Sequence, residues 1–243
     1  MNKYKKIKAI LIDSGRVLNY PRSGNWFMSP NFYEIIEREK FNKIKAYRKR
    51  KAVYEGMKYL DKQTLILREE DEYNCFYKFF DIISDYLPEL DLTYTEITKL
   101  TKDLVYNYKK YEFYDDVYRV IPKLSENIKL ALVSDAWPSI EGVYKHANLR
   151  NYFSSFIISS KLGVSKPNKL MYQTALNELK MKAEEVVFID DNPKNCYGAK
   201  TLGIKAVLLN RDFLVRIKNK IATRGKYDSF ANLDELLKKM KAD

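Results

Sequence analysis

The chain of 243 residues contains little cysteine and almost no histidine. Its two cysteines, Cys75 and Cys196, are far apart and do not have the spacing of a metal site. This argues against a disulfide framework or a cysteine zinc site, and it fits a reducing, cytoplasmic location. His146 is the only histidine, which excludes metal sites built from several histidines and argues against a histidine-based catalytic triad.

Long hydrophobic runs are absent as well. No apolar run approaches the ~20 residues that a membrane-spanning helix needs. Residues 1–8 are basic, but the apolar run after them is too short for a signal peptide and ends in Asp13. We therefore expect a soluble, cytoplasmic protein without a membrane partner. With 46% hydrophobic residues, it can bury a full core and carry a second, smaller module.

The formal net charge of +12 raises the question of nucleic-acid binding. The basic residues are, however, interspersed with acids, and the 20 tyrosines follow no RNA-binding signature. We therefore expect no nucleic-acid partner. The densest basic cluster, residues 43–51, has two interpretations: a solvated helix face, or a surface that attracts anionic substrates.

Strand and helix patterns alternate through most of the chain. Short β-rich runs are found at residues 7–12, 128–133, 156–158, 186–189 and 206–209. After the fourth run, Asn192 can cap a helix with Pro193 at its first position, and Gly203 can end it. Strands that alternate with helices predict a parallel sheet covered on both faces.

The segment from about residue 29 to 111 is almost entirely helical in pattern. Ser29-Pro30 predicts a helix start, and Thr93-x-x-Glu96 resembles a capping box. Between them, one apolar helix face is formed by Tyr73, Phe76, Tyr77, Phe80 and Ile83. A helical insert that follows the first strand suits a lid over the strand tips, which excludes water and selects substrates.

Polar side chains follow several of the predicted strands. Asp13 comes directly after the first apolar run, Ser134-Asp135 after the second, and Asp190-Asp191 ends the fourth. Taken by itself, each of these short motifs is typical of a turn or a helix cap. In open α/β sheets, however, ligands bind outside the carboxyl ends of the strands. The order of these residues therefore favours a phosphoryl-transfer enzyme.

Each of these residues has a chemical role in such a reaction. Asp13 can attack phosphorus and form an aspartyl-phosphate. Ser134 and the neighbouring Asp135 can bind the phosphoryl group, and Lys166 can place a positive charge beside the nucleophile. The pair Asp190-Asp191 offers hard oxygen ligands to Mg²⁺. Without a cation, a phosphate would be repelled by these carboxylates.

The same residues resemble the four motifs of the haloacid dehalogenase-like (HAD) hydrolase superfamily, in order and over nearly the whole chain. The matching segments are 11–18, 130–135, 163–167 with Lys166, and 187–192 continuing to 204. The resemblance implies a Rossmann-like α/β core formed by residues 1–18 and 113–243. It also implies an all-helical cap formed by residues 19–112.

The resemblance further implies the roles of the site residues. Asp13 is the nucleophile, and Asp13, the backbone carbonyl of Gly15 and Asp191 hold Mg²⁺. Catalytic roles fall on Asp13, Ser134 and Lys166, and substrate binding on Ser14, Ser134, Asp135 and Lys166. Whether Asp190 is also a ligand stays open. Asn195 stands where many members carry a further acid, and it is expected to orient the ligands.

The first motif departs from the phosphatase pattern at Gly15. Most phosphatases of the superfamily have a second Asp there, which serves as general acid and base and contributes ~10²–10⁴ in rate. Glycine cannot do this. Three outcomes are open: another group such as Asp190 or a cap residue substitutes, only good leaving groups react, or catalysis is feeble. We expect a reduced but real activity.

Three functions are therefore compared. The first is a Mg²⁺-dependent phosphatase of a small phosphorylated metabolite. The second is a 2-haloacid dehalogenase in which Asp13 attacks carbon, but such enzymes need no metal and usually carry Ser-Ser-Asn where this chain has Asp190-Asp191. The third is a catalytically weakened domain that binds a phosphorylated ligand or a protein partner, which Gly15 keeps open. The sequence favours the first and does not indicate an oligomeric state.

Overall fold

The computed structural model describes residues 4–241. The chain forms two units. One is an α/β unit formed by residues up to 20, 112–136 and 144 onward, and the other is a helical unit formed by residues 21–111 and 137–143. None of the helices within residues 4–241 is long and apolar enough to cross a membrane.

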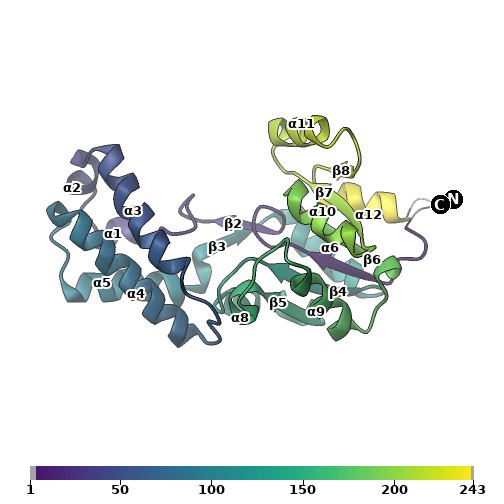
Figure 1. Ribbon diagram of the computed structural model, residues 1–243, viewed down its shortest axis with the longest axis horizontal. Coiled ribbons are helices and arrows are strands. Elements are labelled where there is room, and N and C mark those ends of the chain that lie inside the picture. Colours follow the sequence, from purple (N-terminus) through teal and green to yellow (C-terminus); the bar gives the residue numbers. More distant parts are fainter. Residues whose placement is uncertain (1–3, 242–243) are drawn as a thin grey trace. The chain divides into compact units, whose positions relative to one another are not determined.

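The α/β unit is built on one six-stranded sheet in which every pair of neighbouring strands is parallel. The strand order is β5-β4-β1-β6-β7-β8 (Figure 1). The strands are β1 (Ala9–Ile12), β4 (Lys129–Ser134), β5 (Ser155–Ile158), β6 (Val186–Asp190), β7 (Lys205–Leu209) and β8 (Asp228–Phe230). The predicted α/β fold is confirmed, and five of these strands were predicted; β8 was missed.

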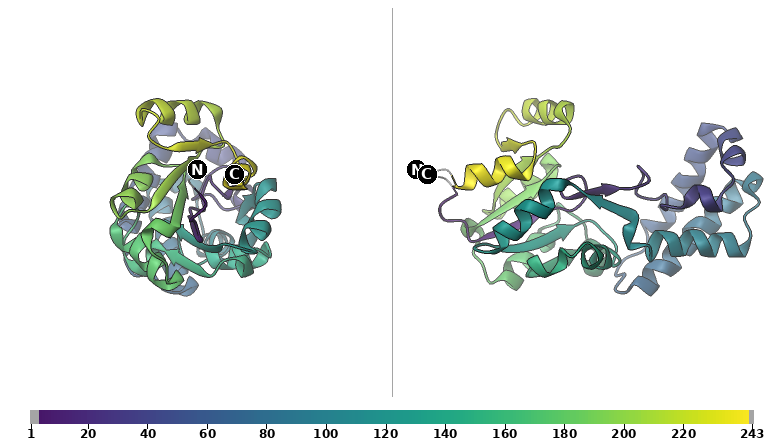
Figure 2. Two further views of the ribbon diagram at one scale, coloured as in Figure 1. Left: turned by 90° about the vertical axis from the view of Figure 1, so that its right-hand side faces the viewer. Right: turned by 180° about the vertical axis from the view of Figure 1, so that it is seen from behind.

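Helices cover both faces of this sheet, as the end-on view of Figure 2 shows. The helices of this unit are α6 (Asp115–Ser125), α8 (Ser159–Leu162), α9 (Lys169–Leu179), α10 (Pro193–Thr201), α11 (Phe213–Ala222) and α12 (Leu233–Lys241), with the 3-10 turns η3 (Arg150–Tyr152) and η4 (Ala183–Glu185). On one face of the sheet, α9 and α10 bury Met171, Tyr172 and Ala199 against Leu11 and Phe188 of the strands. On the other, α6 packs against β4 and α12. Helix α7 (Ile140–His146) spans the boundary of the two units in sequence.

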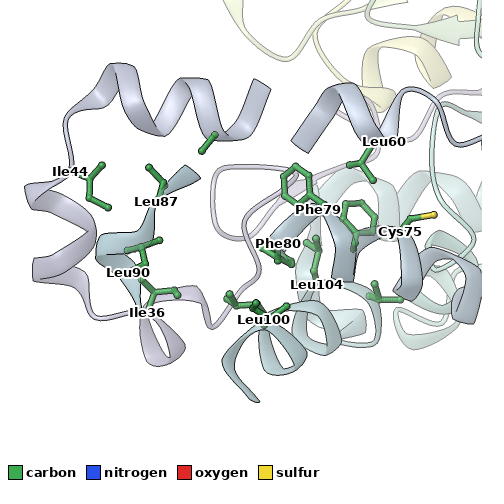
Figure 3. Close-up of a cluster of buried hydrophobic side chains, with 14 of the residues drawn as sticks. Ile36, Ile44, Leu60, Cys75, Phe79, Phe80, Leu87, Leu90, Leu100 and Leu104 are labelled. Carbon is green, nitrogen blue, oxygen red and sulfur yellow. The ribbon is translucent and has the colours of Figure 1, made fainter. Parts of the chain in front are cut away.

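The helical unit surrounds a core of its own. Phe79, Phe80 and Leu100 are among its buried side chains (Figure 3). Helix α4 (Glu69–Tyr86) packs against α3 (Ala46–Leu60) and α5 (Tyr94–Val105). Four of the five residues of the predicted apolar face on α4 contribute aromatic rings to it. The helices are α1 (Phe32–Ile35), α2 (Arg38–Lys43), α3 (Ala46–Leu60), α4 (Glu69–Tyr86) and α5 (Tyr94–Val105), with the 3-10 turns η1 (Pro88–Leu90) and η2 (Tyr108–Lys110).

Local helix signals were predicted with mixed success. The capping box is confirmed, because the Thr93 hydroxyl accepts from the N–H of Glu96 while the Glu96 carboxylate accepts from the N–H of Thr93. The cap at Asn192 is also confirmed. The helix start at Ser29-Pro30 is wrong, since α1 begins at Phe32. A short two-stranded sheet of β2 (Asn19–Pro21) and β3 (Tyr111–Phe113) was not predicted.

The assignment of residues 137–143 to the α/β core is wrong. These residues belong to the helical unit, because Trp137 packs on Phe76 with ring centroids 4.8 Å apart. The Ser139 N–H and hydroxyl also donate to the two carboxylate oxygens of Glu72, at 2.7 and 2.6 Å. The contacts that decide this are distant in sequence, so no local pattern reveals them.

Candidate active site

The carboxyl ends of three neighbouring strands bring the candidate residues together. β1 lies between β4 and β6 in the sheet. β4 and β5 follow it on one side, and β6, β7 and β8 are added later on the other side. Asp13 follows β1 directly, Ser134 is the last residue of β4 and Asp190 is the last residue of β6. Since parallel strands end at one edge of the sheet, these side chains gather at a topological switch point.

Lys166 connects three of the acidic residues. It lies in the loop between α8 and α9, and its Nζ is 2.5 Å from Oδ1 of Asp13 and 2.8 Å from Oδ2 of Asp190. Its backbone N–H donates to Oδ1 of Asp135 at 2.8 Å. The loop can approach α10 closely because a Cβ at Gly198 would lie only 2.9 Å from the carbonyl oxygen of Pro167. The structure therefore holds Lys166 at both its backbone and its ammonium group.

Asp190 is fully buried and both its oxygens are occupied by protein donors. Oδ1 accepts from the N–H of Asn192 at 2.8 Å, and Oδ2 accepts from Lys166. The side-chain amide of Asn195 reaches both oxygens, at 3.2 and 3.1 Å. Asp190 thus holds the site together through hydrogen bonds and has little capacity left for another ligand.

The carboxylates of Asp13 and Asp191 are differently placed. Together with Asp190 they offer oxygen atoms that all lie within 4.8 Å of one another. Within residues 4–241, no hydrogen bond from another residue reaches Oδ2 of Asp13 or the carboxylate of Asp191, whose own backbone N–H lies near it. Two neighbouring carboxylates with free oxygens fit a hard divalent cation such as Mg²⁺, which takes a few carboxylates and keeps several waters.

The electrostatics of the site suit a bound cation. Burial raises the pKa of Asp13 above its ordinary value, and the charge of Lys166 offsets part of this effect. Burial, with the charge of Asp190, raises the pKa of Asp191 to about 6, although Arg16 opposes the shift. The neighbouring carboxylates outweigh burial at Lys166 and raise its pKa. A divalent cation would favour the ionised form of both aspartates.

The remaining predicted residues have distinct positions. The hydroxyl of Ser134 has no hydrogen-bond partner in the described chain, so it can donate to a ligand. Asp135 is exposed, and its carboxylate holds the backbone of Lys166. Gly15 lies two residues after Asp13 and pairs with Asn19 in an isolated bridge. Its carbonyl as a metal ligand stays a prediction.

Ser14 differs from the expectation in the direction of its side chain. Its buried hydroxyl lies 2.9 Å from the hydroxyl of Tyr144 and accepts from the amide of Asn19 at 2.7 Å. The hydroxyl therefore fixes the loop after β1 and is not available to a substrate. Any contact of Ser14 with a substrate has to come from its backbone N–H.

Two asparagines support Asp191 that the sequence analysis missed. The side-chain amides of Asn210 and Asn219 donate to the backbone carbonyl of Asp191, at 2.9 and 3.1 Å. Asn210 directly follows β7, so the rule that polar residues at strand ends lie near the site could have identified it from the sequence. Asn219 lies within α11 and carries no such signal.

A comparison with protein families decides the relationship of the chain. The model of the haloacid dehalogenase-like hydrolases matches residues 33–209. The chain belongs to this hydrolase family. The matched range begins after Asp13, so the first motif of this family member has to be judged from the site itself. There, Asp13 occupies the end of the central strand and contacts Lys166.

Similar proteins include both phosphatases and dehalogenases. (S)-2-haloacid dehalogenase 2 from a Pseudomonas species is 28% identical over 124 residues, which are 50% of this chain and 53% of that protein. Phosphoserine phosphatase from Thermus thermophilus is 31% identical over 86 residues, which are 35% and 34% of the two chains. The chain thus spans about half of the first relative and a third of the second.

A solved structure shows the likeness of the whole fold. A HAD phosphatase from Thermococcus onnurineus is similar with a TM-score of 0.63 and 20% sequence identity. The match covers 98% of this chain and 99% of that one. At this identity the likeness establishes the fold and leaves the reaction to be argued from the site.

Proposed function

We propose that this protein is a Mg²⁺-dependent phosphatase that hydrolyses a small phosphorylated metabolite through an aspartyl-phosphate on Asp13. One observation carries the proposal: Asp13 and Asp191 keep carboxylate oxygens without protein donors, while Lys166 holds the other oxygen of Asp13. Asp13, Asp191 and the carbonyl of Gly15 are the groups that would hold Mg²⁺. The ion supplies positive charge that neutralises the phosphoryl oxygens and these carboxylates.

In the first step, a carboxylate oxygen of Asp13 forms a bond to phosphorus while the bond from phosphorus to the leaving oxygen breaks. The leaving oxygen keeps the electron pair, and where it is too basic to depart as an anion it takes a proton from water. In the second step, water attacks the phosphorus, the bond to Asp13 breaks and inorganic phosphate leaves. Asp13 is then a carboxylate again, so the cycle is complete.

Two side chains of the chain support these steps. The Lys166 ammonium, 2.5 Å from Oδ1 of Asp13, holds the nucleophilic carboxylate in one orientation. It also places positive charge where the phosphoryl group would bind. The free hydroxyl of Ser134, at the end of the neighbouring strand, can donate to a phosphoryl oxygen. Asp135 contributes by holding the backbone of Lys166.

The leaving group determines which substrates react. Gly15 provides no acid, and Asp190 is a poor substitute because its oxygens accept from Asn192, Asn195 and Lys166. The substitution of Asp190 for the missing acid, which the sequence left open, is therefore disfavoured. The geometry supports a phosphatase that acts best on phosphate esters whose leaving oxygen needs no proton.

The two alternatives are tested against the same site. A dehalogenase has no need for the free carboxylate of Asp191, which adds negative charge beside an anionic haloacid. A domain that only binds a phosphorylated ligand has no need for a nucleophile held by Lys166. The cytoplasmic location and the metabolite substrate belong to the same proposal as the phosphatase activity.

Activity on p-nitrophenyl phosphate and a panel of phosphometabolites, with Mg²⁺ or with EDTA, tests the proposal. The wild type is expected to release phosphate only with Mg²⁺, and Asp13→Asn to release none. Asp234→Asn, an exposed carboxylate paired with Arg119, serves as the matched control and should keep wild-type activity. 2-Chloropropionate with chloride detection forms a parallel assay for dehalogenation.

Each result has one meaning. Phosphate release that persists with EDTA or in Asp13→Asn contradicts the proposed mechanism. Chloride release without metal favours the dehalogenase. Tight binding of a phosphometabolite without turnover favours the binding domain.

A further inference from the structure

Helix α11 has an apolar face that its own unit leaves uncovered. None of its residues is buried, although it contains Phe213, Leu214, Ile217 and Ile221. Leu214 and Ile221 are 73% and 72% exposed, and Phe213 is 61% exposed. The helix lies at the periphery of the α/β unit, beyond β7 and β8, in each view of Figures 1 and 2. Apolar side chains of this size are usually buried, so the exposed face needs a reason.

The exposed residues form one continuous stripe. Phe213, Ile217 and Ile221 are four residues apart, and Leu214 precedes Ile217 by three, so they share a face of the helix. The opposite face carries Asn219, whose amide donates to the carbonyl of Asp191 at 3.1 Å and to Oδ1 of Asn210 at 3.2 Å. Polar contacts thus attach α11 to its unit, and its apolar stripe is turned outward.

Basic side chains border this stripe. At about 100° per residue, Lys218 and Lys220 lie on its two sides, and both are exposed. Arg224 and Lys226 follow the helix and are exposed as well. Residues 212–226 contain five basic residues and one acidic residue, Asp212, whose carboxylate accepts from the N–H of Val215 as the helix cap. The segment therefore exposes an apolar stripe that is flanked by positively charged side chains.

We infer that α11 docks onto an anionic lipid surface. Interfacial helices combine an apolar face with flanking Lys and Arg, whose stems lie along the acyl boundary while their charges meet anionic headgroups. A second copy of this chain is disfavoured, because apposed stripes would bring the flanking lysines of both copies together. The expectation of no membrane partner rested on the lack of a spanning segment, and a helix that lies on the surface needs none.

Co-sedimentation with vesicles tests this inference, using the full chain without substrate. The wild type is expected to bind phosphatidylcholine vesicles that contain phosphatidylglycerol at least tenfold more strongly than pure phosphatidylcholine vesicles. The double variant L214E/I221E should lose this binding, and K218E/K220E should weaken it and its salt dependence. Leu67→Glu, at an exposed leucine of the helical unit, is the matched control and should bind like the wild type.

Three outcomes overturn the inference. One is equal binding to both kinds of vesicle or none to either. Another is binding that L214E/I221E does not reduce. The third is a wild type that light scattering finds as a dimer in solution and that L214E/I221E converts to a monomer, which assigns the stripe to a second copy. Circular dichroism of each variant verifies that it folds. None of these measurements depends on the proposed reaction.

Discussion

The ammonium group of Lys166 lies 2.5 Å from Oδ1 of Asp13 and leaves Oδ2 of that carboxylate without a protein donor. This relationship joins residues 153 positions apart in the sequence. It fixes the orientation of a buried carboxylate and keeps one oxygen available. The ammonium group of Lys166 also donates to Asp190, so this one side chain connects the ends of β1 and β6.

Asp191 and Asn195 should affect metal binding to different degrees. Asp191→Asn removes a free carboxylate of the proposed ion site, so isothermal titration calorimetry should detect no Mg²⁺ binding. Asn195→Ala leaves the ligands in place and releases only Asp190, so Mg²⁺ affinity should fall about 10–100-fold. Unchanged affinity in Asp191→Asn would place the ion elsewhere.

The stability of the metal-free protein should fall as the pH rises. Burial raises the pKa of Asp191 to about 6 and raises that of Asp13 as well. In the unfolded chain both values are about 3.9. Because the folded state binds these protons more tightly, the stability that they contribute is complete below about pH 4. It is lost as the pH rises through about 6 and above.

Mg²⁺ should counter this loss, since it binds the ionised carboxylates. We expect the increase in melting temperature on adding Mg²⁺ to be small at about pH 5 and largest at about pH 8. Differential scanning calorimetry with and without Mg²⁺ measures it. An increase that is equal at both values would show that neither aspartate takes part in binding the ion.

Gly15→Asp should extend the range of leaving groups. A carboxyl group at this position can protonate a leaving oxygen, so kcat/KM for an alkyl phosphate should rise by up to ~10²-fold. The value for p-nitrophenyl phosphate should change little, because that leaving group needs no proton. Gly15→Asn is the control, because asparagine has nearly the size of aspartate but no acidic group. A gain in neither substrate would show that another residue already acts as the acid.

The helical unit contains a buried ion pair between Lys110 and Glu72. Nζ of Lys110 donates to the carbonyl of Leu104 and the hydroxyl of Ser139, and lies 3.8 Å from Glu72. Lys110→Met leaves the buried carboxylate of Glu72 without its cation, which should reduce the free energy of unfolding by about 3–5 kcal/mol. Lys58→Met, in an exposed pair with Glu55, should leave it nearly unchanged.

Tryptophan fluorescence during urea unfolding reports on this unit, because Trp26 and Trp137 are the only tryptophans of the chain and both belong to it. Equal midpoints for Lys110→Met and Lys58→Met would show that the buried pair contributes no more than the exposed one.

Local patterns predicted much of the fold and the ends of the strands. Apolar runs gave five strands, and Thr93 and Asn192 gave two helix starts, because capping and strand burial are written in adjacent residues. The positions of Asp13 and Asp190 followed from the same logic. The parallel order of the strands then brings them together without further information.

Contacts between distant residues were beyond such patterns. No residue near Ser14 in the sequence indicates that its hydroxyl is hydrogen-bonded to that of Tyr144. In the same way, none near Asn219 indicates that its amide donates to the carbonyl of Asp191. Likewise, Ser139 belongs to the helical unit only because Glu72 accepts its hydrogen bonds. Such features depend on side chains that meet after folding, so the structure is needed to detect them.

The most direct test of the central claim is the identification of the phosphorylated residue. The protein is mixed with p-nitrophenyl phosphate and Mg²⁺, quenched in acid within one turnover and analysed by peptide mass spectrometry. The account predicts the mass of one phosphoryl group on the peptide that contains Asp13, and none in Asp13→Asn. A phosphoryl group on another residue, or phosphate release by Asp13→Asn at the wild-type rate, would contradict it.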